Sequence, residues 1–374
     1  MKILFILDLY APHIWWVEIL FENIITGLEK NGVHCIILTS RYDTKLASYE
    51  KISENREIYR VGHNRYDFMF YSLFLGYKLA KISDIIHTTT YNSAIPASII
   101  WLLSWKKVIL TVHEIFGKLW YRFMGWKWFF FKLFENMIFL FPFEKYICVS
   151  DYTKNSLRVH FWVSDQKLLT IYNGIDYSFW KRENFSDIKV QEIRKALNIE
   201  HSFVGLFYGR AWVSKWLEYY IQAIPKIVSE VPNFKALLIV PHSSNNPITK
   251  INELIHHLNI EKHVILIPGV WNKELPYYIL GSSFVIIPSL AEWFWFAVAE
   301  VSALNHPLIT SQVAAIPEVA SGKINFVEPW NIEDIITGVI KCKNNIYENI
   351  VKKEFTWEKN IDHTLQIYKK IVWK

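Results

Sequence analysis

Short runs of β-branched and other apolar residues alternate with longer segments of helical pattern, and this alternation restricts the fold more than any other feature of the chain. A strand, a crossover helix and a second strand build a parallel sheet. The pattern therefore predicts an α/β fold with parallel sheets. Strands are expected at residues 3–7, 35–39, 84–88, 108–112 and 146–150, and again at 204–208, 236–240, 264–267, 284–288 and 308–311.

The alternation restarts after the turn sequence Asn173-Gly174-Ile175-Asp176, so two doubly wound domains are expected. The length of 374 residues agrees, because a single domain has about 100–200 residues. We predict an N-terminal domain over 1–172, a C-terminal domain over 173–356 and a closing helix over 357–374. The polar segment 184–192 is interpreted as a linker.

Composition excludes several classes of protein. Hydrophobic residues make up 52% and charged residues 20%, which is typical of a globular chain and not of a disordered one. The 41 basic residues are spread out and leave a net charge of only +6, so no nucleic-acid partner is expected. Three cysteines, Cys35, Cys148 and Cys342, lack metal-ligand spacing and are predicted to be buried thiols. With no signal peptide or spanning segment recognised, a cytoplasmic location is expected.

Glycine and tryptophan occur in unusual numbers, 13 and 17, where glycine alone usually makes up about 7% of a protein. Tryptophans also stand in strand-to-helix turns, Trp15 and Trp16 in one and Trp293 and Trp295 in another. Such turns favour glycine, which adopts positive φ freely and lets a ligand approach the backbone. We hypothesise that the gene reads UGA as glycine and that these tryptophans stand for glycine. The alternative is genuine rings that stack on sugars.

The segment 288–300 joins a predicted strand to a predicted helix and carries two carboxylates. Glu292 lies in the turn, and Glu300 is expected about two turns into the helix. Eight helical residues span at most about 12 Å, which is about the reach from the sugar to the ribose of a nucleotide sugar. The helix N-terminus between them offers free N–H groups, which favour a diphosphate.

A second segment, 208–218, follows another predicted strand and carries Arg210 and Lys215. A planar guanidinium and an ammonium can both neutralise phosphate oxygens. The segment therefore predicts a diphosphate site at the carboxyl edge of the second sheet.

Four segments stand in a fixed order along the chain: 149–154 (Val149-Ser150-Asp151-Tyr152-Thr153-Lys154), 173–176, 208–218 and 288–300. This order is typical of the retaining glycosyltransferases of family 4, which the chain resembles over nearly its whole length. The resemblance implies the GT-B fold, in which two Rossmann-like domains face each other across a cleft. It also implies transfer of a sugar from a nucleoside diphosphate to an acceptor hydroxyl, with retention. Where loops 12–18 and 292–295 depart from the family, tryptophan replaces glycine, which favours the recoding hypothesis.

The resemblance further implies roles for individual residues. Arg210 and Lys215 would bind the donor diphosphate, Glu300 the ribose hydroxyls, and Glu292 and His113 the transferred sugar. The predicted catalytic residues are Arg210, Lys215, Glu292 and His113, and the predicted donor-binding residues add Trp15, Trp16, Trp293, Phe294, Trp295, Phe296 and Glu300. Neither a metal nor a cofactor is expected, because the chain has no Asp-x-Asp and basic residues take the metal's place.

Each role has a plainer alternative. Lys215 could be a solvated lysine, and His113 could be a hydrogen-bonded histidine that shapes the cleft wall. At the level of function, the alternatives are a sugar-nucleotide epimerase on the same fold and an inactive protein that binds glycans or serves as a scaffold.

An aromatic stretch over 120–143 includes Phe129, Phe130 and Phe131 and is interrupted by Lys127 and Lys132. It is too charged to span a bilayer. Two interpretations stay open, a helix at a membrane interface and a core helix facing the cleft. The first agrees with a glycan or lipid-linked acceptor, a role in cell-envelope polysaccharide synthesis and peripheral contact with the inner face of the membrane.

Overall fold

The computed structural model describes residues 1–13, 16–210, 213–241, 248–294 and 296–373. The chain divides into two compact units. Unit 1 comprises Met1–Gly174 and Phe355–Lys374, and unit 2 comprises Ile175–Glu354. The boundaries expected from the sequence, after residues 172 and 356, lie two residues from these divisions.

Unit 1 is built on an eight-stranded sheet in the order β3-β4-β2-β1-β5-β6-β7-β8, parallel except for β3, which runs antiparallel to β4. The central strands are almost completely buried, as expected for a parallel sheet covered by helices, although one of them carries His87, Thr88 and Thr89 beside its apolar residues. The strands are β1 (Lys2–Ile6), β2 (His34–Ser40), β3 (Tyr49–Ser53), β4 (Arg56–Val61), β5 (Ile85–Thr89), β6 (Val108–Val112), β7 (Lys145–Cys148) and β8 (Leu168–Thr170).

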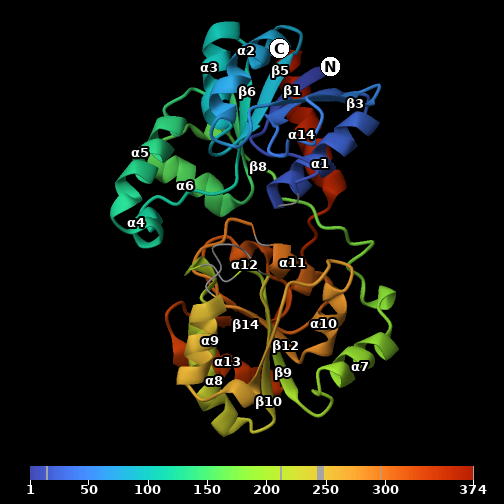
Figure 1. The fold of residues 1–374 in the computed structure, drawn as a ribbon, viewed down its shortest axis with the longest axis vertical. Helices are drawn as coiled ribbons and strands as arrows, with labels where there is room; N and C mark the ends of the chain where they lie inside the picture. Colours follow the sequence, from blue (N-terminus) through green and yellow to red (C-terminus); the bar gives the residue numbers. More distant parts are fainter. Residues whose placement is uncertain (14–15, 211–212, 242–247, 295, 374) are drawn as a thin grey trace. The chain divides into compact units, whose positions relative to one another are not determined.

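Helices cover both faces of this sheet (Figure 1). Alternate residues of β1 belong to different cores: Ile3 and Phe5 pack with α1 and α14, whereas Leu4 and Ile6 pack with the helices of the opposite face. The first face carries α1 (Trp16–Lys30) and α14 (Trp357–Val372). The second face carries α2 (Phe68–Lys81), α3 (Ala94–Ser104), α5 (Trp128–Phe139) and α6 (Asp151–Phe161). The short helix α4 (Leu119–Met124) and the 3-10 turn η1 (Gly125–Lys127) precede α5.

The C-terminal helix α14 completes the core of unit 1. Its Asn360 side chain donates to the carbonyl of Tyr172 at 2.8 Å, and its Tyr368 hydroxyl hydrogen-bonds His87 of β5. Gly174 lies so close to the Trp357 ring that a Cβ there would meet it at 2.3 Å. The end of the chain is therefore part of unit 1.

Unit 2 has a seven-stranded sheet in the order β11-β10-β9-β12-β13-β14-β15, parallel except for β15, which runs antiparallel to β14. Two doubly wound α/β units confirm the predicted fold class. The strands are β9 (Phe203–Tyr208), β10 (Phe234–Ile239), β11 (Val264–Ile267), β12 (Phe284–Ile287), β13 (Leu308–Ser311), β14 (Gly322–Val327) and β15 (Glu348–Ile350).

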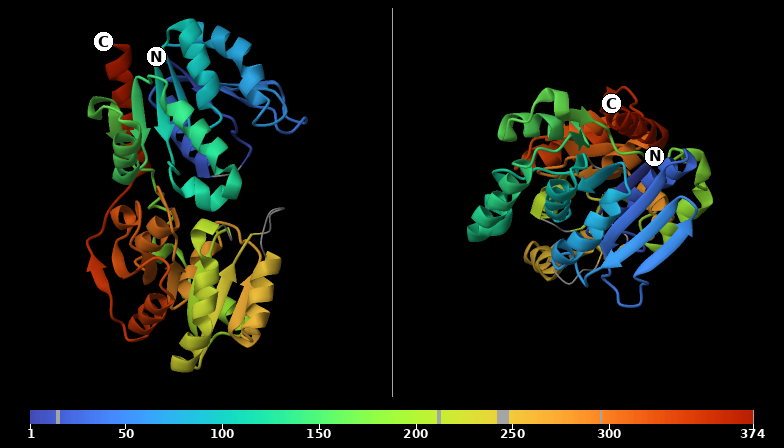
Figure 2. Two further views of the ribbon diagram at one scale, coloured as in Figure 1. Left: turned by 90° about the vertical axis from the view of Figure 1, so that its left-hand side faces the viewer. Right: turned by 90° about the horizontal axis from the view of Figure 1, so that it is seen from above.

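The helices of unit 2 can be followed from two further directions in Figure 2. One face of its sheet packs with α8 (Leu217–Glu230), α9 (Ile248–His257) and α13 (Ile332–Lys343). Two helices, α7 (Asp187–Ala196) and α10 (Leu275–Gly281), pack against each other, and α11 (Phe296–Ala303) and α12 (Ile316–Val319) follow β12 and β13.

The prediction of a linker over 184–192 is wrong, because α7 begins inside it. The helix buries Val190, and the Arg194 guanidinium donates to the carbonyl of Gly281 at 2.5 Å. One buried apolar residue is too weak a pattern to distinguish a helix from a polar linker.

Cys35, Cys148 and Cys342 are buried free thiols, as predicted, and burial raises the pKa of each to about 12. Within the described ranges, no helix combines the length and the apolar character needed to cross a bilayer.

Candidate active site

The two charged segments of the sequence leave the sheet of unit 2 side by side. Strands β9 and β12 are parallel neighbours, with Val285 paired to Leu206, so both segments emerge at the carboxyl edge. Beyond the strands, the backbone N–H of Leu290 donates to the carbonyl of Ser214 at 2.7 Å. The topology therefore brings the segment 208–218 into contact with the segment 288–300.

Lys215 and Glu292 form an ion pair between these segments. The Lys215 ammonium donates to Oε1 of Glu292, and both residues are more than nine-tenths buried. Burial raises the pKa of the Glu292 carboxyl, and the positive charges of Lys215 and Arg210 oppose that shift. The interpretation of Lys215 as a solvated lysine is wrong, because the fold buries it against a carboxylate.

Arg210 follows β9 directly and is exposed. Gly209 before it has φ 131°, a conformation that side-chain-bearing residues rarely adopt. Because the charge of Arg210 also acts on the Glu292 carboxyl, Arg210, Lys215 and Glu292 form one electrostatic group. This group places two cations and one carboxylate at the carboxyl edge of the sheet.

Glu300 lies in α11 and contacts Tyr208, the last residue of β9. The Tyr208 hydroxyl lies 3.1 Å from Oε2 of Glu300 and 3.1 Å from the carbonyl of Ala297. Burial raises the pKa of Glu300 to about 7, and the Tyr208 hydrogen bond opposes the rise. Because α11 begins at Phe296, Glu300 lies about one turn into the helix, and the prediction of two turns is wrong.

Sequence reasoning missed Tyr208 as the partner of Glu300. A usable signal exists, because a tyrosine at the end of a buried strand, directly before Gly209 and Arg210, has its hydroxyl at the same edge as the charged group.

The turn between Glu292 and α11 is filled by aromatic side chains. Trp293 and Phe294 are buried, and the ring of Phe294 packs against that of Phe296 with centroids 5.3 Å apart. Trp295 lies outside the described residues. The predicted phosphate-binding turn thus carries bulky rings beside Glu292.

Four of the described tryptophans adopt the left-handed backbone conformation: Trp105 (φ 58°), Trp162 (φ 57°), Trp216 (φ 56°) and Trp330 (φ 70°). For a residue with a side chain this conformation costs about 1–2 kcal/mol. Trp105 and Trp162 end α3 and α6, at the helix position where glycine is most common. Trp216 precedes α8, directly after Lys215, and its ring lies 3.7 Å from that of Trp330.

His113 and Trp16 lie together in unit 1. His113 follows β6 and is buried, and neither ring nitrogen has a hydrogen-bond partner among the described residues. The Trp16 ring, at the start of α1, lies 4.8 Å from the imidazole in an edge-on arrangement. Burial lowers the pKa of His113 to about 3, so its ring is neutral. Among the described residues the imidazole therefore lacks the hydrogen bond that the alternative interpretation expects, and Trp15 lies outside those residues.

Two family models match the chain: Glycosyltransferase Family 4 over residues 17–179 and Glycosyl transferases group 1 over residues 202–345. The chain belongs to the GT-B glycosyltransferases of family 4. This glycosyltransferase is 24% identical to an uncharacterized glycosyltransferase of Methanocaldococcus jannaschii, a match that covers 99% of the chain and 98% of the relative.

A second relative of this glycosyltransferase is the UDP-Gal:alpha-D-GlcNAc-diphosphoundecaprenol alpha-1,3-galactosyltransferase of Escherichia coli, with 25% identity over 75% of the chain and 72% of the relative. Among solved structures, Anabaena HepE in complex with UDP-glucose superimposes with a TM-score of 0.72 at 14% identity, over 100% of this chain and 98% of that one. At that identity the likeness concerns the fold alone.

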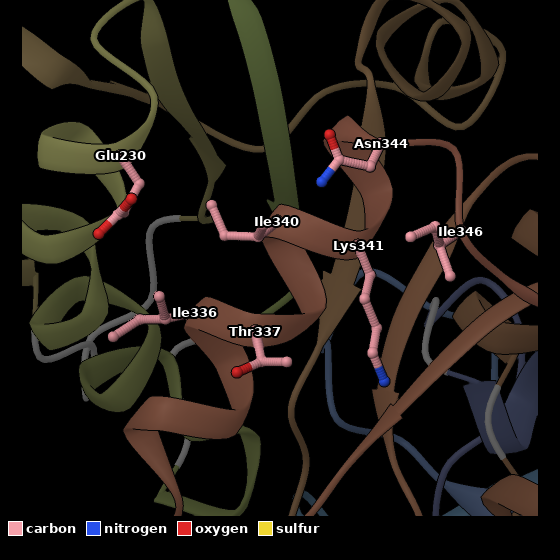
Figure 3. Close-up of a pocket in the computed structure, with 7 residues that line it drawn as sticks. All are labelled: Glu230, Ile336, Thr337, Ile340, Lys341, Asn344 and Ile346. Carbon is pink, nitrogen blue, oxygen red and sulfur yellow. The ribbon is translucent and has the colours of Figure 1, made fainter.

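A surface pocket of the glycosyltransferase lies elsewhere in unit 2, where Glu230 at the end of α8 faces Ile336 and Ile340 of α13 (Figure 3). None of the predicted site residues lines it. Within the described ranges, no three His, Cys, Asp or Glu side chains are grouped so that they could hold a metal ion.

Proposed function

We propose that this glycosyltransferase moves a hexosyl group from a nucleoside-diphosphate sugar to an acceptor hydroxyl, with retention at the anomeric carbon. The observation that carries the proposal is the group formed by Arg210, Lys215 and Glu292 at the carboxyl edge of the unit 2 sheet. When the bond from the anomeric carbon to the diphosphate breaks, negative charge grows on the leaving oxygen. Two positioned cations stabilise that charge, and no protein nucleophile is needed.

The neighbouring residues supply the rest of the donor site. Glu300, oriented by Tyr208, accepts hydrogen bonds from the ribose hydroxyls, and Glu292 accepts hydrogen bonds from the sugar. Backbone N–H groups of residues 293, 294 and 296, before and at the start of α11, meet the diphosphate. In unit 1, His113 is assigned to the sugar and residues 15–16 to the phosphates. The acceptor proton passes to the departing phosphate on the same face of the sugar.

We propose that the reaction needs no resident metal ion. The charge of the diphosphate is met by Arg210 and Lys215, and the sequence has no Asp-x-Asp pair of the kind that holds a metal-bound diphosphate. Activity that persists in excess EDTA is the expected result, and activity that requires added Mg²⁺ or Mn²⁺ would contradict it.

A glycan or lipid-linked acceptor of the cell envelope, met at the inner face of the membrane, is the acceptor we propose. Its support is the Escherichia coli relative, whose name specifies a diphosphoundecaprenol-linked sugar as acceptor. Transfer to a polyprenyl-diphosphate sugar, compared with transfer to the same sugar without the lipid, tests the assignment. Equal rates on the two acceptors would count against it.

We further propose that the natural protein has glycine at positions 15, 16, 216, 293 and 295, through a UGA codon read as glycine. The support is the left-handed backbone at Trp216, the crowded turn at Trp293 and the ring of Trp16 against His113. Peptide mass spectrometry of the native protein tests the proposal. Tryptophan masses at these positions would overturn it.

The functional test uses the full chain with glycine at those five positions and a panel of nucleotide sugars. Removal of one positioned electrostatic donor costs about 10²–10³-fold in rate, so Arg210→Ala is expected to lower kcat/KM by that factor. The matched control is Arg182→Ala, which removes a half-buried arginine of the same unit that pairs with Asp187. Equal activity of the two variants would contradict the assignment, and nuclear magnetic resonance of the product anomer tests retention.

The same assay separates the alternatives. Donor binding without transfer or hydrolysis would favour an inactive glycan-binding or scaffold protein. Interconversion of epimeric nucleotide sugars without an acceptor would favour an epimerase. Either outcome would replace the transferase proposal.

A further inference from the structure

Helix α5 of unit 1 is apolar on two opposite sides. On one side, Ile138 and Phe139 belong to the core, and Phe134 packs against it. On the other side, five large apolar side chains are between 43% and 82% exposed: Phe129, Phe130, Leu133, Met137 and Leu140. A helix that is apolar all around is normally covered on all sides, and exposed apolar patches of this kind mark interaction sites. We call these five residues the α5 face.

The charges around the α5 face are almost all of one sign. Residues 115–143 contain four basic side chains, Lys118, Arg122, Lys127 and Lys132, and a single acidic one, Glu135. Glu135 is completely buried, accepts from the backbone N–H of Phe116 at 2.8 Å and pairs with Lys132 at 3.1 Å. It therefore presents no negative charge at the surface. The segment offers solvent an apolar strip and the exposed basic side chains of Lys118, Arg122 and Lys127.

We propose that the α5 face is a membrane-docking surface that inserts into the interface of a bilayer containing anionic lipids. Apolar side chains lying between basic residues are the pattern of an interfacial helix, which gains from burial among acyl chains and from attraction to headgroups. At 12 residues, α5 is about 18 Å long, too short to cross the hydrocarbon core. The helix therefore lies on the membrane and does not span it.

A second copy of this chain is a poorer occupant of the same surface. A symmetric dimer would bring the α5 face onto itself, and with it the basic side chains of both copies. Like charges across an interface disfavour association, and lysine is depleted in protein interfaces. Anionic headgroups complement the same lysines.

The α5 face contains no tryptophan. Phe129, Phe130, Leu133, Met137 and Leu140 form the α5 face whether positions 126 and 128 carry tryptophan or glycine. The α5 face also contains none of the residues assigned to the donor, which lie in unit 2 apart from His113 and residues 15–16 of unit 1. Failure of the docking surface and failure of the proposed transfer reaction are thus separate outcomes.

The test is flotation of the full chain with vesicles of phosphatidylcholine alone and of equal parts phosphatidylcholine and phosphatidylglycerol. Binding is expected on the anionic vesicles and is expected to weaken with salt. The triple variant Phe129→Ser, Phe130→Ser and Leu133→Ser should lower binding to the anionic vesicles at least ten-fold. The single variant Lys127→Ala should lower it about five-fold. The matched control is Phe70→Ser with Phe74→Ser, two exposed phenylalanines of α2 in the same unit, which should leave binding unchanged.

Three results would overturn the proposal. The first is no binding to anionic vesicles, and the second is an equal loss in the α2 control, which would remove the assignment to α5. The third is a dimer in sedimentation equilibrium that the triple α5 variant dissociates, without any vesicle binding. Because all substituted side chains are exposed, the variants should fold, and circular dichroism checks that they do.

Discussion

Replacement of Trp162 by glycine should stabilise unit 1, although it deletes a large side chain. Trp162 ends α6 with φ 57° and is 87% exposed, so little packing is lost. Glycine adopts the left-handed conformation without strain, which raises the free energy of unfolding by about 1–2 kcal/mol. The greater conformational freedom of glycine in the unfolded chain lowers it by about 0.5–1 kcal/mol. The expected net gain in the free energy of unfolding is therefore about 0.75 kcal/mol, the difference between the midpoints of the two ranges.

Trp373 provides the matched control. It ends α14 in the same unit and is 72% exposed, but its φ is −100°, so a glycine there relieves no strain. Trp373→Gly should lose about 0.5–1 kcal/mol through the greater freedom of the unfolded chain, and loss of the contact between Lys369 Nζ and the Trp373 ring, at 5.9 Å, acts in the same direction. The free energies of unfolding of the two variants should thus differ by about 1.5 kcal/mol, with Trp162→Gly more stable than the parent and Trp373→Gly less stable.

The assay is calorimetric unfolding of the chain as written, made from a synthetic gene. In a unit of this size, about 1 kcal/mol moves Tm by about 2–4 °C, so the two shifts are measurable and of opposite sign. Trp162→Asn should fall between the parent and Trp162→Gly, because asparagine tolerates the left-handed region. If Trp162→Gly lowers Tm as much as Trp373→Gly does, the reasoning from backbone conformation is refuted.

Three further predictions concern the candidate site. Trp16→Gly should uncover His113 and raise its pKa from about 3 toward 6.5, which histidine proton resonances can follow; an unchanged pKa would mean that Trp16 does not bury the ring. Burial raises the pKa of Glu300 to about 7 in the folded protein, above its value in the unfolded chain. The free energy of unfolding should therefore be highest below about pH 4.5 and should fall by about 3 kcal/mol as the pH rises through 7. Glu300→Gln should remove that slope in denaturant titrations, and a slope that persists would contradict the assignment. Lys215→Met or Glu292→Gln alone should destabilise unit 2 by about 3–5 kcal/mol, and a double-mutant cycle should give strong coupling, whereas additive losses would contradict the ion pair.

The alternation of apolar runs and helical segments predicted the central strands and the edge strand β11, but it missed β3, β4 and β8 toward the edges of the first sheet and β14 and β15 toward one edge of the second. Strands β6, β11 and β13 lie where they were expected, because each begins with a run of apolar residues. The missed β3 and β4 form an antiparallel edge hairpin rich in charge, with Lys51 and Glu57 paired. An edge strand has one solvated side, so its sequence resembles a polar loop.

The sequence by itself determined the α/β class, the two charged segments at strand ends and the family, because these depend on local periodicity and on motifs in fixed order. Only the tertiary structure decided which groups meet. Lys215 contacts Glu292 and Tyr208 contacts Glu300 because β9 and β12 are neighbours in the sheet although far apart in the chain. Backbone conformation is information of the same kind. Composition only suggested that some tryptophans stand in turns, whereas the structure shows positive φ at Trp105, Trp162, Trp216 and Trp330, a conformation that favours glycine.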